Sequence, residues 1–297
     1  MAVFFLIFFG FSLTDVGYGF LLMVLSLPFI VYFVVSEPAK QAAKLLFMAG
    51  LSTAVIGVFF ASYFGVSTKY LPDFLSNLQM YDPIGNPLPV FYLALALGVI
   101  HVMFGIFLKI VTEAKNGRFV DGLLTQGTWL FLFVSLILYG ASSLGYFMSV
   151  SGEKLQILVY VALVSVLLGN GAVGKTIGEK IKLSLLSLYN SVSYFSDILS
   201  YSRLLALCLA TSALAFAVNL IASIVYELIP YVGAILAIIV LIIGHAFTIA
   251  VNTLGAFIHS ARLQFVEFFG KFIASAGKEF KPLSRKESFI NLIKDSG

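Results

Sequence analysis

Two arginines lie inside long apolar runs of this sequence, where a fixed positive charge can act on passing ions. Arg203 stands in the run 199–207 and Arg262 in the run 259–267. Burying an arginine in hydrocarbon costs several kcal/mol, so such residues are rare and mark ion pathways or charged partners. The alternative is a snorkelling or structurally paired side chain. For Arg262 that partner is Glu267, five residues further on.

A stripe of polar or small residues precedes each arginine at helical spacing. Steps of three and four residues back from Arg203 reach Ser200, Ser196, Ser193 and Tyr189. The same steps back from Arg262 reach His259, Gly255, Asn252, Thr248 and His245. Residues at this spacing share one face of a helix. Packing through small and hydroxyl residues explains the serines, but it leaves two histidines and an asparagine unexplained.

The composition places these stripes in a membrane. Of 297 residues, 60% are hydrophobic and 11% are charged, against about 25% charged in soluble domains. Mean hydropathy is +1.04. These values exclude an ordinary soluble enzyme, a disordered chain and a nucleic-acid-binding domain, and the net charge of +4 is spread between apolar runs. The single cysteine, Cys208, excludes an internal disulfide and a multi-cysteine metal site.

The apolar residues form seven long stretches: 1–35, 39–66, 88–112, 119–149, 155–170, 178–227 and 232–277. The first stretch is broken by Asp15, Gly17 and Gly19, which suit a helix centre poorly, so we expect two short helices that meet at a turn there. The sequence therefore predicts an all-α polytopic membrane protein with eight transmembrane helices.

The last two stretches are too long for upright spans. Residues 178–227 would form a helix of roughly 75 Å at about 1.5 Å per residue, whereas the hydrocarbon core is about 30 Å thick. We expect both helices to be tilted, to extend into the cytoplasm, or both. The chain divides into an N-terminal group of about six helices (1–170) and a region (171–297) of two long helices and a basic cytoplasmic tail.

Basic residues between the stretches set the predicted orientation. Lys69 and Lys154 fall on one side of the membrane. Fourteen fall on the other: Lys40, Lys44, Lys109, Lys115, Arg118, Lys175, Lys180, Lys182, Lys271, Lys278, Lys281, Arg285, Lys286 and Lys294. The positive-inside rule assigns these fourteen, and both termini, to the cytoplasm.

This orientation makes the two stripes reach opposite surfaces. The cytoplasmic half-channel is predicted to contain Tyr189, Ser193, Ser196, Asp197 and Ser200, and the outer one His245, Thr248, Asn252 and His259. Two offset half-channels that end at fixed cations suit a protein that hands ions to a moving carboxylate. A nearby arginine favours the ionised carboxylate and hence ion release, and it blocks leakage between the routes.

Three other polar positions allow simpler interpretations. Asp197 is either a channel carboxylate or the counter-ion of Lys180 or Lys182. His101 is predicted to be a hydrogen-bonded packing residue. Asp15 is predicted to lie at the external end of a helix, where a charge costs little.

Residues 169–176 match the phosphate-binding pattern G-x-x-x-x-G-K-[ST]. That loop requires a preceding strand, a following helix and an acidic residue for Mg²⁺. Here the preceding run is an apolar helix, so we interpret the segment as a glycine-rich cytoplasmic turn and expect no nucleotide or metal on this chain.

Five segments resemble one known family. The segments 200–207 and 259–267 are similar to the last two helices of subunit a, called subunit I in prokaryotes, of the V/A-type rotary ATPases. The segment 9–19 resembles the family's FGxxxGDxGxG signature at the first membrane turn, and 98–101 and 125–127 also fit. The resemblance covers essentially the whole chain.

The resemblance implies a stator subunit that couples proton or sodium transport to ATP hydrolysis or synthesis. Arg203 and Arg262 match the family's functional arginines, and His259 its polar residue one turn before the second. The implied partners are a proteolipid ring, the peripheral and central stalks and the bilayer, most naturally a prokaryotic plasma membrane. The ATP chemistry belongs to other subunits, and no cofactor is expected here.

The chain departs from some members of the family. Tyr189 and Asn252 stand where some members carry glutamates, and Asp197 stands where eukaryotic members carry histidine. The family also has a large cytoplasmic N-terminal domain, so this sequence corresponds to the membrane half or to part of a split subunit. The alternative function is a secondary ion-coupled transporter with a midplane site at Arg203.

Overall fold

The computed structural model describes residues 2–32, 36–66, 71–143, 152–174, 176–228 and 231–272. Every regular element in these ranges is helical, as predicted. In chain order they are α1 (Ala2–Leu13), α2 (Val16–Val31), α3 (Glu37–Phe60), α4 (Asp73–Ser76), α5 (Pro87–Lys115), α6 (Phe119–Gly122), the π-helical η2 (Leu123–Gly127), α7 (Thr128–Ser143), α8 (Gly152–Ala172), α9 (Ile177–Leu199), α10 (Ser202–Leu228), α11 (Gly233–Arg262), the π-helical η3 (Leu263–Phe268) and α12 (Phe269–Phe272). Lys69, Lys175 and the predicted basic tail beyond Phe272 lie outside the described residues.

Within those ranges, six helices or helix runs are long and apolar enough to cross a membrane. They are Glu37–Phe60, Pro87–Lys115, Phe119–Ser142, Gly152–Ala172, Ile177–Leu228 and Gly233–Phe272. The chain is therefore an integral membrane protein. α1 and α2 have 12 and 16 residues, fewer than the ~20 that a full span needs. The predicted number of eight spans is thus not established, although the division of the first stretch into two helices is confirmed.

The turn between α1 and α2 is built around Asp15. Asp15 is the N-cap of α2, so its predicted position at a helix end is confirmed, but it is 1% exposed, so the prediction that a charge costs little there is wrong. The carboxylate instead accepts four hydrogen bonds, from the backbone N–H groups of Tyr18 (3.0 Å), Phe64 (3.1 Å) and Gly65 (3.3 Å) and from the hydroxyl of Ser62 (2.7 Å). These bonds replace hydration of the buried charge and tie α2 to the loop after α3.

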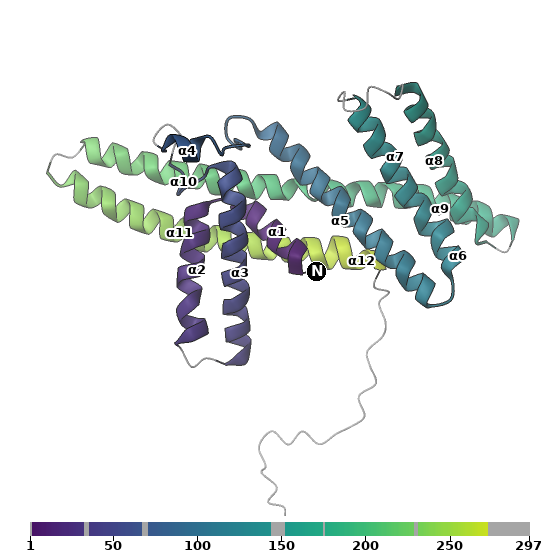
Figure 1. Cartoon of the computed structure of the whole chain (residues 1–297), viewed down its shortest axis with the longest axis horizontal. Coiled ribbons are helices and arrows are strands. Elements are labelled where there is room, and N and C mark those ends of the chain that lie inside the picture. The colour runs from purple at the N-terminus through teal and green to yellow at the C-terminus, as the bar shows by residue number, and fades with distance from the viewer. Residues whose placement is uncertain are drawn as a thin grey trace, which may run out of the picture.

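α2 and α3 form a hairpin in which two backbones touch. A Cβ at Gly19 would stand 2.6–2.7 Å from the backbone of Ala54 and Gly50, which explains a glycine in the middle of this apolar helix. The hairpin crosses the longest helices steeply, whereas α10 and α11 lie side by side along the long axis of the molecule (Figure 1). α1 packs against α3, α10 and α11 and so joins the two groups.

The predicted helix 178–227 is two helices. Thr176 and Glu179 form a capping box at the start of α9, and the chain then breaks at Ser200 and Tyr201 before α10. In the break the backbone N–H groups bond three residues back: Tyr201 to Ile198 (3.1 Å) and Leu204 to Tyr201 (3.0 Å). This 3₁₀ spacing turns the chain by about 120° per residue instead of about 100°. The face of α9 that carries the serines is therefore not simply continued by α10.

The other long helix is continuous but irregular. α11 ends at Arg262, and the chain continues as the π-helical η3 and then as α12. Each arginine thus adjoins a departure from α-helical geometry, of a kind often found at functional positions.

The segment that matched the phosphate-binding pattern connects two helices. Gly169 lies within α8, and Thr176 caps α9. A helix, rather than the required strand, precedes the segment, in agreement with its interpretation as a turn.

Candidate functional site

Both arginines lie within electrostatic reach of one buried carboxylate. Glu267 of η3 is 3% exposed, and its Oε1 is 3.9 Å from Nε of Arg262. Glu267 also interacts electrostatically with Arg203, at the first turn of α10. The sequence suggested Glu267 as a partner of Arg262 alone. The fold also brings Glu267 within range of a longer-range electrostatic attraction to Arg203, with no ion pair between these two residues.

The two arginines differ in exposure. The side chain of Arg262 is 56% exposed. Arg203 is half-buried, and its Nη1 is buried without a hydrogen-bond partner among the residues that the structure describes. Arg203 is therefore the guanidinium that retains unused donors inside the fold.

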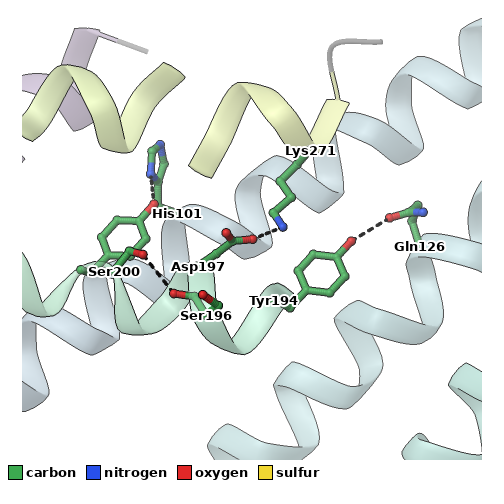
Figure 2. A network of polar contacts seen from close by, with 8 residues as sticks. His101, Gln126, Tyr194, Ser196, Asp197, Ser200 and Lys271 are labelled. Carbon is green, nitrogen blue, oxygen red and sulfur yellow. Dashed lines mark hydrogen bonds and ion pairs between the residues drawn. The ribbon is translucent and has the colours of Figure 1, made fainter. Parts of the chain in front are cut away.

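The stripe on α9 lies on the outer surface of the chain. Ser193, Ser196 and Tyr189 are exposed, Tyr189 by 72%. Ser200, at the break, is half-buried and donates its hydroxyl to the carbonyl oxygen of Ser196 at 3.0 Å (Figure 2). No helix in the described part of the chain covers these side chains.

Asp197 is paired with a residue that sequence reasoning did not associate with it. Its carboxylate forms an ion pair with Lys271 of α12, and neither Lys180 nor Lys182 is its partner, so that alternative is corrected (Figure 2). The same ammonium lies 4.1 Å from the ring centroid of Tyr194, which is a cation–π contact. The Tyr194 hydroxyl donates to Gln126 Oε1 at 3.4 Å. α9, α12 and η2 are thereby linked.

The stripe on α11 faces the interior of the chain. Thr248 is 1% exposed and Asn252 is 7% exposed, while His245 and His259 are half-buried. The Asn252 side-chain nitrogen has no hydrogen-bond partner among the described residues, and neither does His259 Nδ1. The same holds for Ser260 Oγ, Gln264 Nε2 and Glu267 Oε2, so unused polar atoms recur along this helix as far as η3.

His245 has two partners that the sequence did not indicate. The Asn219 amide nitrogen donates to the Phe64 carbonyl oxygen at 2.7 Å, so Asn219 Oδ1 accepts from His245 Nε2 at 3.2 Å. His245 Nδ1 and the Tyr18 hydroxyl form the second hydrogen bond, at 2.7 Å. Asn219 could have been identified from the sequence as a polar residue within the apolar run of α10.

His245 also borders a large apolar cavity. The cavity has a volume of about 1150 Å³ and lies between the α2–α3 hairpin and α11, with Leu22, Leu45, Ile249 and Phe257 among its lining residues. The polar stripe of α11 therefore has an apolar surface beside it.

His101 is a hydrogen-bonded packing residue, as predicted. It is fully buried on α5, and its Nδ1 lies 2.7 Å from the Tyr201 hydroxyl. Its ring stacks on Phe268 with 4.1 Å between the ring centroids. The sequence did not indicate a role for Tyr201 or Phe268, because aromatic residues are common in apolar helices.

Comparison with known proteins identifies the region that contains these residues. The model of the V-type ATPase 116 kDa subunit family matches residues 190–285, which include both arginines. The A-type ATP synthase subunit I of Methanocaldococcus jannaschii is 33% identical, over 96% of this chain and 44% of that protein. That of Pyrococcus abyssi is 34% identical, over 96% and 42%. The V-type ATP synthase subunit I 1 of Treponema pallidum is 27% identical, over 89% and 44%.

The chain spans less than half the length of these curated relatives, yet the similarity extends over nearly all of its own length. The membrane helices, the arginine-containing segments and these matches agree with one another. The chain belongs to the subunit I (subunit a) family of the V- and A-type ATPases.

Proposed function

We propose that this chain is the membrane stator of a rotary ATPase, in which Arg203 faces a rotating ring of carboxylate-bearing subunits. The observation that carries the proposal is that Arg203 and Arg262 lie at the irregular points of two long helices that pack together, with Nη1 of Arg203 buried and without a hydrogen-bond partner among the described residues. A cation buried in such an apolar run is costly. In a stator, such a cation can release the ion that a carboxylate carries and can keep the two ion routes separate.

The ion-handling step follows from charge. As a ring carboxylate approaches Arg203, the guanidinium favours its ionised form, so the carried proton or sodium ion leaves. After the carboxylate has passed, it meets the other route and is neutralised again. The arginine also repels any cation that would pass directly between the two routes. Rotation is thereby the only way across.

The cytoplasmic route comprises Tyr189, Ser193, Ser196, Asp197 and Ser200. The exposure of Tyr189, Ser193 and Ser196 on this chain supports a route whose second wall is supplied by the ring. The pair formed by Asp197 and Lys271 gives that route a charged border.

The outer route comprises His245, Thr248, Asn252 and His259, enclosed by the chain itself. The unused polar atoms of Asn252 and His259 can bond to water or to a passing ion. In this proposal both termini are cytoplasmic, and the stalk subunits and ATP chemistry belong to other chains of the complex.

The test is Arg203→Ala in the assembled complex in sealed vesicles, with ATP-driven ion uptake as the measurement. We expect uptake to be lost while the complex remains assembled. Arg203→Lys should lose most of it too, because lysine lacks the planar guanidinium. Arg118→Ala is the matched control, since the Arg118 side chain is 62% exposed after α5.

Uptake near the wild-type rate in Arg203→Ala would refute the proposal. Solute-coupled ion movement by this chain alone, without ring or ATP, would instead support the transporter alternative.

A further inference from the structure

His101 lies between the two irregular segments that hold the arginines. On one side its Nδ1 is 2.7 Å from the hydroxyl of Tyr201, which lies in the break two residues before Arg203. On the other side its ring stacks on Phe268, the last residue of the π-helical segment after Arg262, with 4.1 Å between centroids and 10° between planes. One side chain of α5 thus contacts both arginine-bearing segments.

The orientation of His101 is fixed by an aromatic enclosure. Phe4 and Phe8 of α1 lie 4.4 Å and 5.0 Å from its ring, measured between centroids. Phe8 also contacts the ring of Tyr201 edge-on at 5.5 Å. His101 and Tyr201 are both 0% exposed. A rotated imidazole would have to displace at least one of these rings, so the hydrogen bond has one geometry.

Tyr201 is seated directly on the backbone of α5. A Cβ at Gly98 would stand 2.6–3.0 Å from the ring and Cβ atoms of Tyr201, which real side chains do not tolerate. The tyrosine therefore fits only because position 98 is glycine. With the His101 bond at its far end, Tyr201 is held at both its base and its hydroxyl.

The position of Tyr201 matters because it lies where the helix changes its winding. Each residue in a 3₁₀ turn rotates the chain by about 20° more than in an α-helix. If the break became regular helix, the direction of Arg203 from the axis of α10 would change. The π-helical segment after Arg262 similarly depends on what packs against it, and His101 packs against Phe268 there.

We propose that His101 is a positioning residue that fixes Arg203 and Arg262 relative to each other by holding Tyr201 and Phe268. The inference rests on the proposed function, in which Arg203 must meet a passing carboxylate. His101 itself contacts neither the ring nor the ion. It acts through the Tyr201 hydroxyl bond and the Phe268 stack.

The test uses four variants of the assembled complex: His101→Phe, His101→Asn, His101→Gln and Tyr201→Phe. Phenylalanine preserves an aromatic stack on Phe268 but removes the hydrogen bond. The side-chain amide of asparagine occupies the place of Nδ1, which makes the bond, whereas that of glutamine occupies the place of Nε2, which does not. The measurement is the number of ions pumped per ATP hydrolysed in sealed vesicles.

We expect His101→Phe, His101→Gln and Tyr201→Phe each to lower this coupling ratio by up to about fivefold, because losing one buried hydrogen bond shifts the equilibrium between held and displaced Tyr201 by about that factor. His101→Asn should stay within about twofold of wild type, because it restores the bond. A purely structural role would reduce the amount of complex without separating asparagine from glutamine.

Equal coupling ratios in the asparagine and glutamine variants would overturn the inference. If the His101 variants do not assemble, Tyr201→Phe decides alone, and normal coupling in it would also overturn the inference. Loss of uptake in Arg203→Ala together with normal coupling in Tyr201→Phe would leave the proposed function standing and this inference rejected.

Discussion

The stripes that precede Arg203 and Arg262 lie in opposite surroundings. Ser193 and Ser196 on α9 are exposed on the surface of the chain. Thr248 and Asn252 on α11 are buried, against a core to which α1 contributes Phe9. Two segments with the same periodic pattern thus have different environments, because the stripe of α11 faces other helices of this chain, whereas α9 packs on α5 and α8 through a different face.

The contrast indicates which parts of each predicted route this chain supplies. The middle of the α11 stripe, Thr248 and Asn252, is buried by this chain itself, since α11 packs against α1 and α10. The α9 stripe has one wall, and a second chain must supply the other if water is to be confined there. Helical periodicity identifies a polar face, but what covers that face depends on tertiary packing.

The largest effect on the buried surroundings of the α11 stripe is expected from Asp15→Ala. Asp15 holds the turn that places α2, and Tyr18 of α2 bonds to His245 of the enclosed stripe. Removing the carboxylate leaves four donors without their acceptor, at an expected cost of about 3–5 kcal/mol. Thermal unfolding of the purified chain in detergent measures this loss. Asp73→Ala, at an exposed site, should have little effect, and equal losses would contradict the role of Asp15.

A smaller loss of stability is expected from Lys271→Met, which tests the ion pair between Asp197 and Lys271 at the border of the α9 stripe. The side chains of Lys271 and Asp197 are 13% and 22% exposed. Leaving Asp197 unpaired should cost about 2 kcal/mol, less than a fully buried pair would. Arg118→Met is the control, because its pair with Glu113 is largely exposed and should cost under about 1 kcal/mol. If both changes cost the same in thermal unfolding, the Asp197 pair is only a surface contact.

Thiol labelling measures the contrast between the stripes directly. In a Cys208→Ser background, Ser196→Cys of the isolated chain in detergent should react at least about tenfold faster than Asn252→Cys, because a buried thiol must wait for local opening. Adding the ring should protect the Ser196→Cys site and leave the Asn252→Cys site unchanged. Comparable rates for the two sites in the isolated chain would show that α11 is no more enclosed than α9.

Much of the fold was predictable because helices follow apolar runs. The stretch 88–112 corresponds to α5 (Pro87–Lys115), and the split at Asp15 followed from a charge close to Gly17 and Gly19. The break at Ser200 and Tyr201 was not predictable, because both residues are tolerated in helices. Tyr201 packs on Gly98 and bonds to His101 of α5, and contacts between residues so far apart in the chain cannot be read from local sequence.

The site was predictable only where one helix carries all of the relevant residues. Arg262 and Glu267 are close in sequence, and their pairing could be anticipated. Lys271 and Asp197 are 74 residues apart. The sequence predicted Lys180 or Lys182 as the partner of Asp197 because these lysines are nearer along the chain. The pair with Lys271 depends on how the helices pack.

The smallest effects are expected on stability when the stripes themselves are made apolar. Ser196→Ala should change the free energy of unfolding by less than about 0.5 kcal/mol, because the side chain is exposed. Asn252→Leu should also be close to neutral, because the Asn252 amide nitrogen is buried without a hydrogen-bond partner among the described residues, so its removal relieves an unsatisfied group. Stripes kept for packing would lose stability in both variants. If the stripes serve ion transport, both variants should keep their stability in detergent and lose ATP-driven uptake in the assembled complex. A loss of stability without a loss of uptake would show that these polar residues serve packing.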